Sequence, residues 1–175
     1  MEYSAVIHHS CIMKILRYVV ILLLIVSAGS GVSIAQTKTS KKEAKLAAVK
    51  KAVETRHYTF NADYVLPLRG SARQLTSEYD LRVTPDSVIS FLPYFGQAYL
   101  DVPYNPTDGG IKFTSTKFEY KVDERKKGGW EITINPKDAK GIQRLILDIS
   151  ADGYASLSVT STNKDFISYN GALKL

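Results

Sequence analysis

The apolar positions of this chain change their period at His57. Before it, Leu46, Val49 and Val53 recur at the three- or four-residue spacing of one helix face, with alanines around them. After it, apolar and polar residues alternate, which is typical of strands that have one buried and one exposed face. The sequence therefore predicts one helix, ending at about Arg56, followed by a domain made of strands.

The start of the predicted helix carries a capping pattern. Ser40-Lys41-Lys42-Glu43 matches a capping box, in which a serine hydroxyl and a glutamate carboxylate satisfy free amide groups of the first turn. Residues 36–40 would then be a polar leader, and residues 41–56 a basic amphipathic helix.

Nine short segments of the remaining chain carry the alternating pattern, and turn-forming residues separate them. The segments are Tyr58–Ala62, Tyr79–Val83, Val88–Leu92, Ile111–Phe113, Phe118–Val122, Trp130–Ile134, Leu145–Ile149, Ala155–Val159 and Phe166–Tyr169. Such regular spacing favours an all-β domain, either a small antiparallel β-barrel (lipocalin-like) or a β-sandwich of about eight or nine strands. Between Phe113 and Phe118 the apolar residues move from odd to even positions, so a bulge or a turn is expected at 115–117.

The first 35 residues have the organisation of a secretory signal peptide. Two basic residues precede an apolar run at 18–26, and small residues follow it. The run is about half the roughly 20 residues that a transmembrane helix needs. Small side chains at Ser33 and Ala35 predict cleavage between Ala35 and Gln36, and Met13 is an alternative start that lies close to the basic residues.

Cleavage at that point would leave an exported protein without cysteine. Cys11 lies before the apolar run, whereas a lipoprotein needs its cysteine directly after such a run, so no lipid anchor is expected. Export would place the protein in the periplasm or outside the cell, where a chain without thiols is well suited. The expected parts are a signal peptide (1–35), the leader and helix (36–56) and a single antiparallel β domain (57–175).

The basic charge of the chain is concentrated in one segment. The 175 residues include 23 Lys and Arg against 17 Asp and Glu, a net charge of +6. Residues 36–56 hold seven basic and two acidic side chains, whereas residues 57–175 hold fourteen of each sign. The helix could therefore make peripheral contact with an anionic membrane surface, or its lysines could simply face solvent. Nucleic-acid binding is not expected, because no aromatic residue is interleaved with these lysines.

Few side chains of catalytic or metal-binding type remain after residue 35, where His57 is the one histidine. A nucleophilic triad needs a base that titrates near neutral pH, and a zinc site of the usual type needs three or four His or Cys ligands. We therefore expect no cofactor, no metal and no enzymatic activity. A carboxylate-based hydrolase is the enzymatic alternative, and its candidate acids are Glu78, Asp80, Glu119 and Glu131.

One segment is too rich in aromatic residues and proline for a simple strand. Leu92-Pro93-Tyr94-Phe95-Gly96-Gln97-Ala98-Tyr99 is followed closely by Pro103-Tyr104-Asn105-Pro106. These rings could form a rigid aromatic lip on a cleft, where hydroxyls and an amide orient a ligand that lies on apolar rings. They could equally close one end of a barrel as core residues. The candidate ligand-binding residues are Tyr94, Phe95, Gln97, Tyr99 and Tyr104.

Three motifs resemble the domain-of-unknown-function family numbered 4251 from Bacteroidetes. They are residues 92–99, the Gly-Gly-Ile-Lys-Phe segment at 109–113 and Ile-Ser-Tyr-Asn-Gly at 167–171. The resemblance implies a small, secreted or envelope-located, β-rich protein, and it supplies no established activity. In that setting Asp86-Ser87-Val88 resembles an acceptor pattern for O-linked glycans, which makes Ser87 a candidate modification site.

Together these observations predict an exported, non-enzymatic binding module with an aromatic-lined cleft. Its partner would be a small molecule, a glycan or an envelope protein. The main alternative is a structural or protein-interaction component of the cell envelope, in which the aromatic residues belong to the core.

Overall fold

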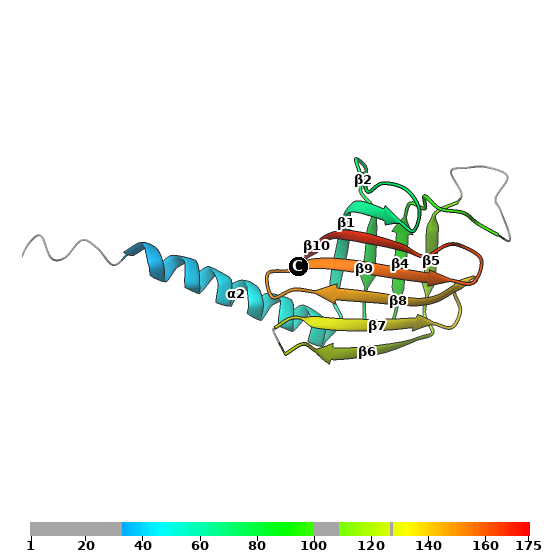
Figure 1. Ribbon diagram of the computed structural model, residues 1–175. Helices are drawn as coiled ribbons and strands as arrows, with labels where there is room; N and C mark the ends of the chain where they lie inside the picture. The colour runs from blue at the N-terminus through cyan, green and yellow to red at the C-terminus, as the bar shows by residue number, and fades with distance from the viewer. Residues whose placement is uncertain (1–32, 100–108, 127) are drawn as a thin grey trace, which may run out of the picture. The chain divides into compact units, whose positions relative to one another are not determined.

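The described residues, 33–99, 109–126 and 128–175, form one helix and ten antiparallel strands in the computed structural model (Figure 1). Side chains are described from Lys41 onward, outside the same gaps. The elements are α2 (Ser33–Thr55), β1 (Tyr58–Pro67), β2 (Arg73–Gln74), β3 (Asp80–Val83), β4 (Val88–Leu92), β5 (Ile111–Ser115), β6 (Phe118–Glu124), β7 (Trp130–Pro136), β8 (Ile142–Ile149), β9 (Tyr154–Ser161) and β10 (Ile167–Lys174). The predicted signal segment up to residue 32 and the candidate Tyr104 lie outside the described residues.

The strands form a nearly closed barrel. The order in the sheet is β5-β4-β3-β1-β10-β9-β8-β7-β6, with β2 beside β1, and every pairing is antiparallel. Figure 1 shows β6 to β10 side by side, with β4 and β5 crossing behind them. The prediction of an all-β barrel after one N-terminal helix is confirmed.

Each predicted strand is present, with differences at the ends. β10 continues to Lys174, beyond the predicted end at Tyr169, because its pairing with β1 extends through Asn170 and Gly171, residue types that are depleted in strands. β2 was not predicted, since two exposed residues carry no alternation.

The start of the helix differs from the prediction. α2 begins at Ser33, so Ser40 lies inside the helix rather than at a cap, and residues 36–40 are helical rather than a separate leader. No glycine or proline interrupts the sequence between Ser33 and Thr55, and alanine, glutamine and lysine favour helix continuation. No helix in the described part of the chain is long and apolar enough to cross a membrane.

The apolar stripe of the helix contributes to the core at its C-terminal end. Val49, Ala52 and Val53 are buried with the strand residues, whereas Leu46 stays exposed. The helix ends where Arg56 adopts a positive φ of 53°, and the amide of His57 donates to the carbonyl of Ala52 at 3.0 Å.

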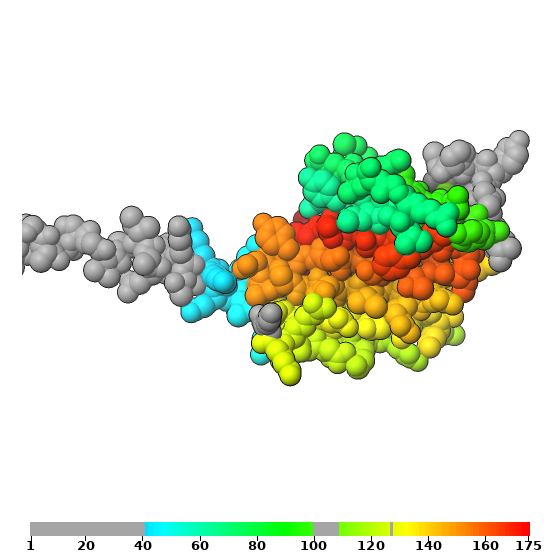
Figure 2. Space-filling model, in the orientation of Figure 1, coloured from blue at the N-terminus to red at the C-terminus, as the bar shows by residue number. Residues whose placement is uncertain are grey.

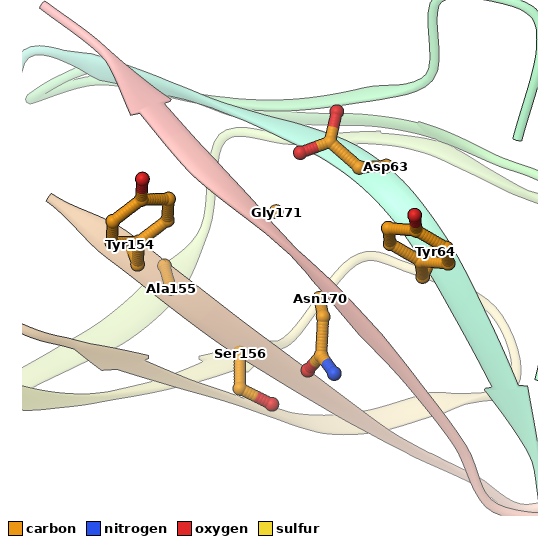
Figure 3. A pocket seen from close by; sticks show the side chains of 7 residues that line it. All are labelled: Asp63, Tyr64, Tyr154, Ala155, Ser156, Asn170 and Gly171. Carbon is orange, nitrogen blue, oxygen red and sulfur yellow. The ribbon is translucent and has the colours of Figure 1, made fainter. Parts of the chain in front are cut away.

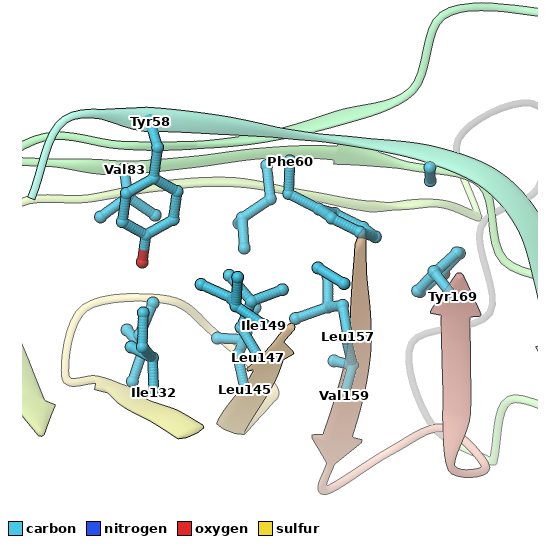
Figure 4. Close-up of a cluster of buried hydrophobic side chains, with 14 of the residues drawn as sticks. Tyr58, Phe60, Val83, Ile132, Leu145, Leu147, Ile149, Leu157, Val159 and Tyr169 are labelled. Atoms are coloured by element: carbon cyan, nitrogen blue, oxygen red, sulfur yellow. The ribbon is translucent and has the colours of Figure 1, made fainter. Parts of the chain in front are cut away.

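The barrel interior is filled with side chains. Phe60 of β1 and Leu81 of β3 belong to one buried cluster with Leu147, Leu157 and Tyr169, and all five are fully buried. Figure 4 shows Phe60 pointing toward Leu147 and Leu157 on the facing strands. The described side chains thus occupy the space in which a lipocalin holds its ligand.

One carboxylate holds the corner between β5 and β6. The expected irregularity at 115–117 is a turn, and it joins two strands that stand at opposite ends of the sheet order. Asp138 accepts hydrogen bonds from the amides of Thr116 at 3.0 Å and Lys117 at 3.2 Å, and from the hydroxyl of buried Ser115. These hydrogen bonds, led by that from Ser115, lower the pKa of Asp138 from 3.8 to about 2.

We expect the Asp138→Asn substitution to lower the urea midpoint of unfolding at pH 7. The depressed pKa means that the carboxylate stabilises the fold above pH 3.8, and that this contribution is lost as the pH falls toward 2. The difference between wild type and variant should therefore shrink between about pH 4 and pH 2. Asp86→Asn removes the same charge from an exposed turn and serves as the control. A difference that is constant with pH would contradict the assigned role.

Candidate functional site

The aromatic segment after β4 is tied to the connection between β9 and β10. Ala98 pairs with Lys164 in an isolated bridge, the amide of Tyr99 donates to the carbonyl of Asn163 at 2.8 Å, and the amide of Asp165 donates to the carbonyl of Gln97 at 3.0 Å. These backbone hydrogen bonds hold the segment in place, and its proline and bulky residues also restrict its conformation.

Two tyrosines fix the beginning of this segment. Tyr169 is buried in the core, and its hydroxyl donates to the carbonyl of Pro93 at 2.6 Å. The hydroxyl of Tyr94 donates to the carbonyl of Gln97 at 2.7 Å and lies 3.3 Å from the carbonyl oxygen of Asp165. Burial raises the pKa of Tyr169 far above its ordinary value, so this hydroxyl keeps its proton and remains a donor.

Lys164 connects three segments at the site. Its ammonium donates to the carbonyls of Gly109 at 2.7 Å and Gly110 at 2.9 Å, and it lies 5.0 Å from the ring centre of Tyr94. Burial lowers the pKa of this ammonium. Lys164 therefore joins the start of β5 to the aromatic segment, because its ammonium binds the two glycine carbonyls and also lies over the ring of Tyr94.

The result is a cleft of about 360 Å³ on the outer surface, beside β3, β4 and β5. The residues that line it are Tyr79, Phe91, Pro93, Tyr94, Phe95, Gly110 and Lys112. The rings of Tyr79 and Phe91 stack with their centres 5.8 Å apart, and Phe91 and Phe95 remain 44% and 37% exposed.

Cations stand over the exposed rings of the cleft. The ammonium of Lys112 lies 5.0 Å from the ring centre of Phe91, and the guanidinium of Arg73 lies 5.1 Å from that of Phe95. The cleft therefore combines flat apolar surfaces with positive charge at their faces. Such a site can bind a ligand whose ring packs on the aromatic side chains and whose hydroxyl or acidic groups contact the cations.

Only some of the predicted ligand-binding residues line the cleft. Tyr94 and Phe95 line the cleft. Gln97 instead supports it, because its carbonyl accepts from Tyr94 and its side-chain oxygen lies 3.4 Å from Arg69. Tyr99 is 59% exposed and donates to Asp165 at 2.5 Å, outside the set of cleft residues. Since Phe95 and Tyr99 are exposed, the segment does not close the barrel end as a buried plug.

Sequence reasoning missed Tyr79, Phe91 and Lys112. Phe91 stands at an exposed position of β4, between the buried Ser90 and Leu92. An aromatic residue in the polar phase of a strand is the signal that could have identified it. Its proximity to Tyr79 and Lys112 depends on the pairing of β4 with β3 and β5.

The candidate acids of a hydrolase do not converge. Asp80 forms an ion pair with Arg82, and Glu119 forms one with Lys137 at 3.0 Å on β6. Glu131 shares Arg125 with Asp148, at 2.8 Å and 2.6 Å. Asp80, Glu119 and Glu131 thus each have a basic partner. Glu78 is exposed just before β3, and none of the four candidate acids lines the cleft.

Ser87 lies in the turn between β3 and β4, as predicted for a glycan acceptor. Its hydroxyl is 2.8 Å from that of Thr84, and its amide donates to the same Thr84 oxygen at 2.9 Å. Modification at Ser87 stays a prediction.

Comparison with known proteins gives a family and a fold. The family described as "Domain of unknown function (DUF4251)" matches residues 40–173. A crystal structure of a DUF4251 family protein from Bacteroides eggerthii DSM 20697 is similar, with a TM-score of 0.54 and 16% sequence identity over 74% of this chain and 87% of that one. No curated protein matches the chain. The match of the family model over residues 40–173 shows that the chain belongs to the DUF4251 family of unknown function.

Proposed function

We propose that this protein is an exported, non-enzymatic binding module that holds a small or glycan-like ligand in the cleft of Phe91 and Phe95. The observation that carries the proposal is the exposure of these two rings, 44% and 37%, beside a recess of about 360 Å³. Covering the part of each ring that stays in contact with water would stabilise a bound ligand.

The cleft is preorganised for binding. Tyr169 anchors Pro93 from inside the barrel, and Lys164 holds Gly109 and Gly110 from the other side. A ligand would therefore pay little conformational entropy for ordering the site. This rigidity supports the interpretation of the segment as a binding site for a ring, and not as a solvent-exposed loop without a ligand.

The charges of the cleft favour a ligand that carries acidic or hydroxyl groups beside an apolar face. Lys112 lines the recess, and Arg73 stands over Phe95. A sugar acid meets both requirements, because its ring has an apolar face and its carboxylate can approach the cations. Stacking of such a ring on one aromatic face contributes about 0.5–1.5 kcal/mol.

Export is part of the same proposal, and it rests on the basic, apolar and small-residue order of the first 35 residues. Mass spectrometry of the native protein, purified from its own cells, should find an N-terminus at Gln36. A native protein that retains Met1 or Met13 would contradict export by this signal.

We expect Phe91→Ala to weaken ligand binding in the cleft by about three- to tenfold, the loss of one stacking contact, while leaving the fold intact. Saturation-transfer NMR with galacturonate, glucuronate and their neutral counterparts should detect transfer from wild type to at least one acid. Phe91→Ala should lower that signal, and loss of the stack on Tyr79 should lower the free energy of unfolding by about 0.5–1.5 kcal/mol.

Phe166→Ala is the matched control, since Phe166 is 42% exposed and does not line the cleft. Equal transfer to wild type and Phe91→Ala would show that the ring does not hold the ligand. Absence of transfer from wild type to every acid would refute the ligand class.

A further inference from the structure

A second concave surface lies on the outer face of β1, β10 and β9. It has a volume of about 430 Å³, and its lining residues are Asp63, Tyr64, Tyr154, Ala155, Ser156, Asn170 and Gly171. We call it the β10 groove. Figure 3 shows Tyr64 and Tyr154 on opposite sides of β10, with Asn170 and Ser156 between them and Asp63 at one side. In Figure 2 the red band of β10 lies between the green and the orange segments of the surface. None of its residues belongs to the cleft.

The register of the strands brings the polar side chains in the floor of the β10 groove together. Tyr64 is paired with Asn170, and Asn170 is paired with Ser156, so these three residues form one row across β1, β10 and β9. Neighbours in such a row stand about 5 Å apart, which is close enough for adjacent side chains to contact one ligand.

A β-bulge adds a carboxylate to the row. The register between β1 and β10 shifts between Ala62 and Tyr64, so Asp63 is the extra residue, and both Asp63 and Tyr64 are exposed. Bulges commonly redirect a side chain next to a functional site. Gly171 faces Ala62 here, and a Cβ on it would come within 1.8 Å of the carbonyl oxygen of Asn61. The local geometry of the groove therefore requires glycine at this position.

The two tyrosines form the walls. Tyr64 is 46% exposed and Tyr154 is 68% exposed, on strands that flank β10. Two strand spacings, roughly 10 Å, separate β1 from β9. Tyr154 lies two residues along β9 from Ser156, so the two tyrosines stand diagonally across β10. Lys45 stands 5.6 Å from the ring centre of Tyr154.

The polar side chains in the floor of the β10 groove are unpaired among the described residues. Across the described part of the chain, the side chains of Asp63, Ser156 and Asn170 make no hydrogen bond or ion pair with another residue. An amide, a hydroxyl and a carboxylate offer both donors and acceptors to a ligand. Asp63 is the charged residue of the lining and would repel an acid, whereas Lys45 stands outside the lining, over the ring of Tyr154.

We propose that the β10 groove binds a neutral pyranose unit of a glycan chain, with the apolar faces of the sugar against Tyr64 and Tyr154. Its hydroxyls bond to Asn170, Ser156 and Asp63. The groove is open on the outer face of the sheet, so a chain can pass across it rather than being enclosed. This site is independent of the cleft and differs from it in charge.

Affinity electrophoresis of the full chain in native gels tests the assignment, with xylan, mannan, mixed-linkage β-glucan and dextran as neutral probes. At least one of the four should retard the wild type. Tyr64→Ala and Tyr154→Ala should each weaken the apparent affinity by about three- to tenfold, the loss expected for one stacking contact. Both side chains are exposed, so the unfolding midpoints should stay close to that of wild type.

Two controls separate the β10 groove from the cleft. Tyr64→Phe retains the ring and should keep most of the affinity, and Phe91→Ala alters only the cleft and should bind the neutral probe like wild type. Polygalacturonate serves as the acidic probe. Wild-type mobility that none of the four neutral polysaccharides changes would overturn the proposal. Retardation that survives Tyr64→Ala and Tyr154→Ala but disappears in Phe91→Ala would overturn it as well, and would assign glycan binding to the cleft.

Discussion

The double pairing of β1 is the constraint on which the barrel depends. β1 is hydrogen-bonded to β3 along one side and to β10 along the other, so it joins the strands β3 to β5 to the strands β6 to β10. The contact with β10 is possible because Gly171 has no Cβ, since that atom would overlap the carbonyl of Asn61. Without this close approach the two parts of the sheet would lose their common strand.

β10 also supports both candidate sites, because successive residues of a strand face opposite sides. Tyr169 points into the core, and its hydroxyl fixes Pro93 at the edge of the cleft. The next residue, Asn170, is exposed in the floor of the β10 groove. One short strand thus gives rigidity to two surfaces that differ in chemistry. The cleft has cations over aromatic rings, and the groove has one carboxylate and unpaired polar groups.

The barrel closes without a ladder between its end strands. β5 and β6 follow one another in the chain but are not neighbours in the hydrogen-bonded order. Asp138 takes the place of a ladder at that corner by accepting hydrogen bonds from the amides of Thr116 and Lys117. Arg125 plays a similar part on the outer surface, where it holds the facing carboxylates of β7 and β8. Asp138 and Arg125 thus both connect neighbouring parts of the fold.

The sequence by itself determined where all strands but the short β2 lie and most of their buried positions, because alternation records one-sided burial and is a local property. Val122 of β6 is an exception, since it continues the apolar phase but is exposed. It also identified the aromatic segment at 92–99 and the turn at 115–117. It failed at the start of α2, since a capping motif does not begin a helix when the residues before it are also helix formers. Only the tertiary structure decided which rings are exposed and what they stand beside. Phe91 joins Lys112, and Tyr64 joins Asn170 and Ser156, through pairings between strands, and β1 and β10 are the first and the last strand of the domain. Such pairings depend on the packing of the whole core, which no local pattern encodes.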